Sequence, residues 1–221
     1  MSCHALLKEH HRSIRGDMPQ ALNMRIHRAL SWLHRAEQCD NDTDGKFIFL
    51  WIAFNSAYAQ ELPREQRLST QLTFTEFLAR LHREDAEKHL DWLVWKEFSG
   101  TIRRLLDTPY VFESFWAFHR GHIGEDSWKE RFAKGQQRAA RLRSKGDTPE
   151  LLALVLQRIY TARNQLMHGG ATWNSAINRQ HVQDCCDIME KLVPLLITIM
   201  MGSSETDWGE TCYPVVENAV A

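Results

Sequence analysis

Apolar side chains recur at every third or fourth position along most of the chain, a spacing that gathers them on one face of an α-helix. Leu22, Ile26 and Leu30 form such a stripe and predict a helix over about 19–38. Segment 46–59 is apolar on nearly every side, which is typical of a helix at the centre of a bundle. The alternation typical of strands is almost absent. The pattern therefore predicts an all-α fold, an up-and-down helical bundle.

Additional short helices fill the middle third of the chain in this prediction. They are expected at about 73–83, 84–107, 110–120 and 129–145. We interpret residues from about 73 to 145 as a helical insertion within a single domain that covers 1–201. From residue 202 onward the chain carries four acids and no Lys or Arg. We expect 202–221 to be a loosely ordered acidic tail.

Two longer helices are expected in the last third. Thr148-Pro149 provides an N-cap and a first-turn proline for a helix that ends at Gly169-Gly170. The last helix is predicted over about 176–201 and contains the longest apolar run, 192–201. This run is shorter than the roughly 20 residues that a membrane span needs. We therefore interpret it as part of a buried core helix.

Two features of the middle third allow more than one interpretation. Its many aromatic side chains, among them Trp92 and Phe112, are more typical of packing than of a platform for stacked bases. Segment 129–145 carries seven Lys or Arg against one acid. Such a run is usually a solvated helix face, and the alternative is a strip in which Arg138 and Arg141 bind RNA phosphates.

The composition is that of an ordinary globular protein, with 221 residues, 43% hydrophobic and 25% charged. A formal net charge of −1 argues against a protein that coats nucleic acid, but it permits a local basic groove. The five cysteines include the adjacent Cys185-Cys186 and suit a reducing compartment better than a disulfide framework. The first residues show no secretory pattern. We therefore expect a cytoplasmic protein that does not associate with a membrane.

The most informative chemical pattern is segment 163–168, Arg-Asn-Gln-Leu-Met-His, at the end of a predicted helix. Asn164 and His168 are four residues apart and share one helix face. Arg163 lies about 140° around the axis from His168, and its long side chain can reach the same cleft. Histidine accepts and donates protons near neutral pH, whereas arginine stays protonated and grips phosphate oxygens. Arg-x4-His is a weak pattern alone, but the set suits RNA cleavage through a 2′-hydroxyl without a metal ion or cofactor.

Two segments resemble the same protein family. Residues 162–182, ARNQLMHGGATWNSAINRQHV, carry an Arg-Asn-x3-His-Gly pattern that resembles the signature of HEPN domains (higher eukaryotes and prokaryotes nucleotide-binding). The continuation is most similar to the Apea-like branch. Trp51-Ile52-Ala53-Phe54-Asn55, followed by Tyr58, resembles another helix of that branch. Together the matches cover about 46–60 and 157–201.

The resemblance implies a bundle that dimerises and joins two Arg/His motifs at the interface. Many HEPN domains are metal-independent endoribonucleases in toxin–antitoxin, phage-defence or RNA-processing systems. By position, Arg163 would bind the scissile phosphate, His168 would act as general acid or base, and Asn164 would orient His168 or a phosphate oxygen. Asn55 would face the same site, or it would only satisfy a buried polar group. The implied partners are RNA, a second copy of the chain and an antitoxin or regulatory protein.

Some HEPN toxins carry a tyrosine two residues after the His, and a partner nucleotidyltransferase modifies it. Gly170 occupies that position here, which argues against this mode of neutralisation. The same fold without cleavage would be an RNA- or nucleotide-binding module. A pure interaction protein would instead hold a partner through the acidic tail and the aromatic middle. His10-His11 and His119-x2-His122 lack nearby Cys or carboxylate groups at familiar zinc spacing, so we interpret them as surface histidines.

Overall fold

The computed structural model of the chain describes residues 2–59 and 70–213, with side chains described in 2–59 and 73–213. Within these ranges the secondary structure is helical and contains no β-strand, which confirms the all-α class. The helices are α1 (Cys3–Ile14), α2 (Gln20–Glu37), α3 (Thr43–Tyr58), α4 (Thr70–Glu84), α5 (His89–Trp92), the π-helical η2 (Leu93–Glu97), α6 (Ser99–Asp107), α7 (Glu113–His119), α8 (Glu125–Lys145), α9 (Thr148–Met167) and α10 (Arg179–Gly202).

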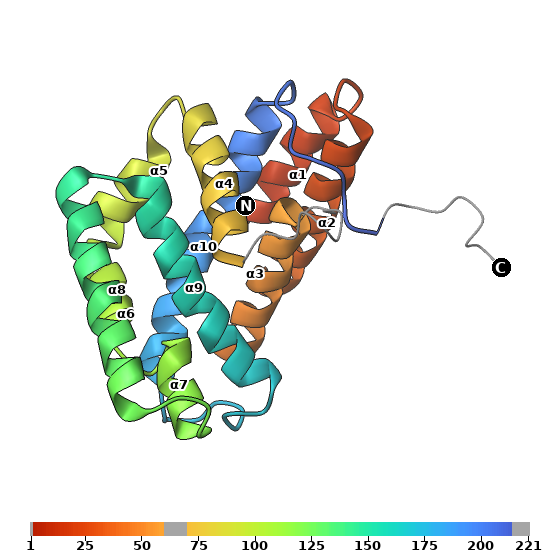
Figure 1. Ribbon diagram of the computed structural model, residues 1–221. Helices are drawn as coiled ribbons and strands as arrows, with labels where there is room; N and C mark the ends of the chain where they lie inside the picture. Colours follow the sequence, from red (N-terminus) through yellow and green to blue (C-terminus); the bar gives the residue numbers. More distant parts are fainter. Residues whose placement is uncertain (1, 60–69, 214–221) are drawn as a thin grey trace.

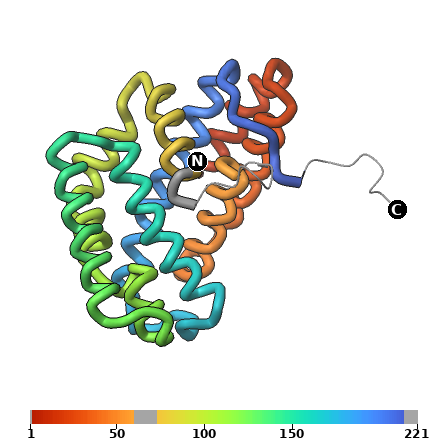
Figure 2. The backbone as a smooth tube through the Cα atoms, in the orientation of Figure 1, coloured from red at the N-terminus to blue at the C-terminus, as the bar shows by residue number. Residues whose placement is uncertain are grey.

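Helix α10 runs along the molecule between two groups of helices (Figure 1). Helices α1 to α3 lie on one side and α5 to α8 on the other, and α10 contacts members of both groups. Helix α3 contacts α2, α9 and α10, as expected for a helix that is apolar on nearly every side. Ile26 of α2, Phe54 of α3 and Ile197 of α10 are fully buried in the shared core. The backbone trace in Figure 2 shows α9 crossing from the α8 side toward α3.

Helix α1 has no counterpart among the helices predicted from the sequence. Its face toward the bundle carries His4, Leu7, His11 and Ile14, so the two fully buried positions on this face are histidines. Nε2 of His11 lies 2.9 Å from Oδ1 of Asn23 on α2. Because histidines alternate with Leu7 and Ile14 on this face, hydrophobic periodicity reveals the helix only weakly. The interpretation of His10-His11 as surface histidines is therefore wrong for His11.

Two helix starts differ from their predicted positions. The Asp85 carboxylate accepts hydrogen bonds at 3.1 and 2.7 Å from two backbone N–H groups of α5, so a new helix begins inside predicted segment 84–107. The side chain of Asp147, rather than that of Thr148, caps α9. The Thr148 hydroxyl instead accepts a hydrogen bond at 2.7 Å from Nε1 of Trp95. This contact ties the start of α9 to the middle third of the chain.

The prediction of a loose acidic tail is wrong for residues 202–213. Trp208 is buried, and Arg25 is only 1% exposed because it reaches across this segment. The Arg25 guanidinium donates hydrogen bonds to the carbonyls of Gly209 and Glu210, and to that of Ala57 on α3. A buried cation thus gains carbonyl acceptors and fixes the segment to the bundle. Residues 214–221 lie outside the described part of the chain.

Aromatic side chains of residues 112–132 form a half-buried cluster between α7 and α8, whereas Trp92 is 57% exposed and lies outside it. Phe112 lies 5.3 Å from Phe132, and Phe115 lies 5.3 Å from Trp128, measured between ring centroids. The Arg158 guanidinium of α9 sits 4.3 Å from the Phe112 centroid. Burial lowers the pKa of Arg158 to about 10. These rings serve packing, as the sequence predicts, but they lie beside the main core.

All five cysteines are free thiols. No helix in the described ranges is long and apolar enough to cross a membrane.

Candidate functional site at the end of α9

Helix α9 ends in a motif that depends on Gly169 and Gly170. Gly169 adopts a left-handed conformation with φ of +69°. Its N–H donates to the carbonyl of Leu166 at 3.2 Å, and the N–H of Gly170 donates to the carbonyl of Gln165 at 2.7 Å. This is the Schellman arrangement, which satisfies the last carbonyls of a helix. It places His168 at the C-cap, where its side chain is exposed.

A pocket of about 210 Å³ lies beside this helix end. Helix α9 contributes Asn164, Gln165 and His168, and α7 contributes Trp116 and Arg120. The loop before α10 and the first turn of α10 complete the wall. The lining therefore combines an imidazole, amides, a guanidinium and an indole, groups that bind phosphates and the faces and edges of bases. Among the side chains that the structure describes, no cluster of three metal-binding groups lies in this wall.

Arg163 lies next to the pocket without lining it. Its Nη1 donates a hydrogen bond to Oδ1 of Asn164 at 2.9 Å. Because Oδ1 is engaged in this way, the amide nitrogen of Asn164 is the group left to contact a ligand. Asn164 and His168 therefore share one pocket, as predicted, and Arg163 acts on it through Asn164.

Two arginines that sequence reasoning missed line the pocket. Nη2 of Arg120 lies 2.5 Å from Oε1 of Glu113, about two helical turns earlier in the chain. Both side chains are at least half exposed, so solvent screens the pair and Arg120 can exchange Glu113 for an anionic ligand. Arg179 is held more firmly by two hydrogen bonds, of 2.7 and 3.0 Å, to the carboxylate of Asp44.

Asp44 anchors the loop that forms one side of the pocket. Besides Arg179, the Asp44 carboxylate accepts a hydrogen bond from the N–H of Asn174 at 2.7 Å. Burial raises the pKa of Asp44, but the hydrogen bonds from Arg179 and Asn174 outweigh it and leave the pKa below its ordinary value. The same loop carries Trp173 and Ile177, which are 73% and 75% exposed. The pocket is thus bordered by uncovered apolar side chains.

A second histidine lies close to the pocket. Gln165 and Trp116, both in the pocket wall, donate hydrogen bonds of 2.7 Å to the carbonyl of Tyr110. The ring of His181 lies 5.9 Å from the Tyr110 ring, and its Nδ1 is buried without a hydrogen-bond partner within the described residues. Burial lowers the pKa of His181. The imidazole of His181 therefore favours its neutral form, and it lies beside Tyr110 without lining the pocket.

The other predicted site residues lie elsewhere. Asn55 lines a different pocket, with Arg28, Thr211 and Cys212. Its expected position opposite His168 is therefore wrong. Arg138 pairs with Glu150 in the first turn of α9, and the exposed Arg141 follows one turn later on α8. At a rise of about 1.5 Å per residue, Glu150 lies about 27 Å from His168 along α9.

No residue of the basic strip is in the wall of this pocket. Arg138 and Arg141 lie toward the far end of α9, because α8 turns back into α9 at Gly146 and the two helices run in opposite directions. No protein-family model matches the chain, and neither curated proteins nor solved structures match it significantly.

Proposed function

We propose that this chain is a metal-independent endoribonuclease of HEPN type, with its active site in the pocket at the end of α9. The observation that carries the proposal is the presence of His168, Asn164 and Arg120 in one pocket wall. Arg163 donates a hydrogen bond to Asn164, so a second guanidinium lies directly beside the pocket wall. These groups can bind a phosphodiester and transfer protons, and the resemblance in segments 46–60 and 157–201 agrees with them.

In the proposed reaction, a 2′-oxygen of RNA attacks the adjacent phosphorus and the bond to the 5′-oxygen breaks. The products are a 2′,3′-cyclic phosphate and a 5′-hydroxyl. His168 accepts the 2′-hydroxyl proton or protonates the leaving oxygen. Arg120 stabilises the negative charge that develops on the phosphorane oxygens, and Arg163 beside the pocket orients Asn164. Asn164, oriented by Arg163, donates to a phosphate oxygen.

A homodimer would supply the second acid–base group. Met167, Trp173 and Ile177 are exposed apolar side chains around His168, and such a surface is typical of an interface. Pairing two copies across this face brings two His168 imidazoles to a single cleft, so that one accepts a proton and the other donates one. The proposed setting is cytoplasmic, with an antitoxin or another regulatory protein as a further partner in a toxin–antitoxin or phage-defence system.

The proposal is tested by incubating labelled RNA with the wild type, His168→Ala and His119→Ala in the presence of EDTA. His119 is an exposed histidine outside the pocket and serves as the matched control. We expect fragments with 2′,3′-cyclic phosphate ends from the wild type and from His119→Ala, and none from His168→Ala. Equal cleavage by all three proteins, or cleavage only with added metal, would contradict the proposal.

A second candidate function is RNA or nucleotide binding without cleavage. It is favoured by the position of Arg163, which is engaged by Asn164 instead of facing the pocket. In this case RNA binds but remains intact at every pH, and Arg163→Ala weakens binding by loosening Asn164. The alternative of a pure interaction protein relied on the acidic tail to hold a partner. It is less favoured because Arg25 fixes part of this tail to the bundle.

A further inference from the structure

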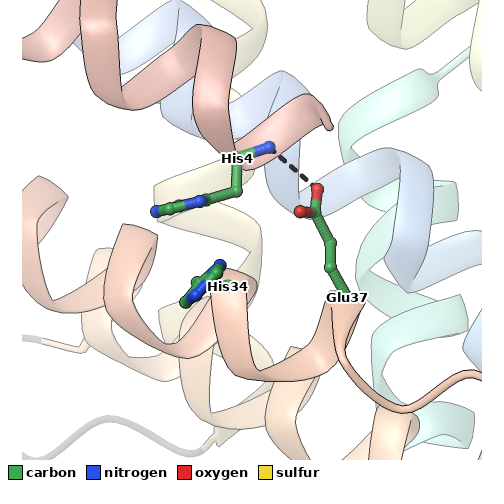
Figure 3. Close-up of side chains that lie close together, drawn as sticks. All are labelled: His4, His34 and Glu37. Carbon is green, nitrogen blue, oxygen red and sulfur yellow. Dashed lines mark hydrogen bonds between the residues drawn. The ribbon is translucent and has the colours of Figure 1, made fainter. Parts of the chain in front are cut away.

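Three side chains able to bind a metal ion meet where the start of α1 lies against the end of α2 (Figure 3). His4, His34 and Glu37 each offer one ligand atom, and these atoms all lie within 4.8 Å of one another. The rings of His4 and His34 face each other with centroids 4.3 Å apart and planes tilted by 33°. None of the three residues belongs to the pocket at the end of α9.

Regular helix geometry holds the three groups together. His34 and Glu37 are three residues apart on α2, so their side chains emerge on the same face. His4 lies in the first turn of α1, and its N–H donates to Oε1 of Glu37 at 2.8 Å. The hydrogen bond between His11 and Asn23 fixes the other end of α1 to α2. Ligands on two docked helices are positioned more firmly than ligands on loops.

The His4 ring is the unusual member of the cluster. It is 6% exposed, and within the described chain its nitrogens make no hydrogen bond. Because these nitrogens are not among the fully buried atoms without a partner, they are open to a ligand such as a metal ion. Burial, the neighbouring His34 and the nearby Lys8 all lower the pKa of His4. The ring is therefore neutral near pH 7, the state in which imidazole binds a metal.

The other two groups also have atoms to offer. Nε2 of His34 lies 3.1 Å from the amide of Gln38, which leaves Nδ1 available. With its amide turned so that the oxygen faces His34, Gln38 would accept the Nε2 proton and orient the ring, the usual arrangement around a metal-bound histidine. One oxygen of Glu37 binds the N–H of His4, and the other has no hydrogen bond to a described residue.

We propose that His4, His34 and Glu37 form a binding site for a divalent transition-metal ion such as Zn²⁺. Two imidazoles and one carboxylate are a ligand set that Zn²⁺ accepts, with bonds of about 2.0–2.2 Å and a fourth position open to water. Small side-chain rotations bring atoms that lie within 4.8 Å to these distances. Ca²⁺ and Mg²⁺ are disfavoured because they prefer an all-oxygen shell.

Positively charged side chains near the cluster raise the alternative that it binds an anion instead of a metal ion. His4 and His34 line a groove of about 340 Å³, which also carries Lys8, Arg12 and Arg15 together with His11 and His27. These groups oppose a cation, and they would favour an anion such as phosphate. We assign the site to a metal because Glu37 brings a negative charge to the same point as two imidazoles. Because protons compete with a metal ion for imidazole nitrogens, metal binding should weaken at acidic pH.

The test is titration of the chelator-treated full-length protein with Co²⁺ and Zn²⁺, followed by visible absorption and calorimetry. The wild type should bind one equivalent, with the absorption of four-coordinate Co²⁺. His34→Ala should bind at least tenfold more weakly, and it should still fold because His34 is exposed. Glu37→Gln should also bind at least tenfold more weakly, although glutamine retains an oxygen to accept the N–H of His4.

His27→Ala is the matched control, because His27 lines the same groove but lies outside the ligand cluster. Its metal affinity should equal that of the wild type. The proposal is overturned if the wild type does not bind either metal, or if the variants at His34 and Glu37 bind as tightly as His27→Ala. It is also overturned if inorganic phosphate binds and competes while metal does not. RNA cleavage in EDTA is a separate readout and should be unaffected.

Discussion

Gly169 determines where α9 ends and thereby where His168 lies. A side chain at this residue would be forced into the left-handed region, at φ of +69°. We expect Gly169→Ala to lower the free energy of unfolding by about 1–2 kcal/mol, the usual strain of that conformation. Urea unfolding monitored by circular dichroism measures the change.

Gly100 is the matched control, because it lies in α6 with open space around its Cβ position and an ordinary helical conformation. Gly100→Ala should raise the free energy of unfolding by up to about 1 kcal/mol. Equal effects at the two glycines would show that the α9 end does not depend on the left-handed residue.

At the scale of single elements, the docking of α1 should depend on pH. Burial is the main cause that lowers the pKa of both His4 and His11. Unfolding returns these groups to an ordinary pKa of about 6.5, so the unfolded chain binds more protons below that pH. Stability should therefore be full above about pH 6.5 and decrease as the pH falls toward the lower folded pKa values.

Urea midpoints of metal-free protein at pH 7.5 and 5.5 measure this dependence. His11→Gln removes one titrating ring and should reduce the difference between the two midpoints. His10→Gln changes an exposed neighbour and should leave the difference unaltered. A wild-type midpoint that is constant over this range would contradict the account of α1.

Helix α10 should protect its two cysteines from alkylation. Burial raises the pKa of Cys186 to about 12 and that of Cys185 well above its ordinary value, so neither forms the reactive thiolate at neutral pH. We expect iodoacetamide to modify the exposed Cys3 of the native chain and to reach Cys185 and Cys186 only after unfolding. Mass spectrometry of timed samples measures the order. Early modification of Cys186 would indicate that α10 opens locally.

At the scale of the whole molecule, the long amphipathic helices could be predicted because their burial follows a local pattern. Segments 19–38 and 46–59 correspond to α2 and α3 within a few residues, since each apolar stripe faces the core. The helix that carries His168 was also predicted from its stop at Gly169-Gly170. Helix α1 has no counterpart in the prediction because histidines occupy two of the four positions that face the bundle and interrupt the apolar stripe.

The composition of the pocket could be predicted only for residues on one helix. Asn164 and His168 are one turn apart, so their shared face follows from helical pitch. Arg120 joins them from α7, and Asn55 lines another pocket because of how α3 sits in the bundle. Such positions depend on how elements that are distant in sequence pack together. The spacing of residues along the chain does not reveal this packing. For the same reason, the sequence does not predict that His4 of α1 and His34 of α2 lie together.

The central claim is that RNA is cleaved in the pocket at the end of α9, and one comparison of cleavage rates tests it directly. Arg120 lines this pocket, whereas Arg141 lies on α8 near the opposite end of α9. Both side chains are exposed, so Arg120→Ala and Arg141→Ala should fold equally well. We predict that Arg120→Ala slows single-turnover cleavage at least about tenfold, as loss of a charge-stabilising group does, and that Arg141→Ala cleaves at the wild-type rate. Slower cleavage by Arg141→Ala with a normal rate for Arg120→Ala would place the reaction elsewhere and contradict the account.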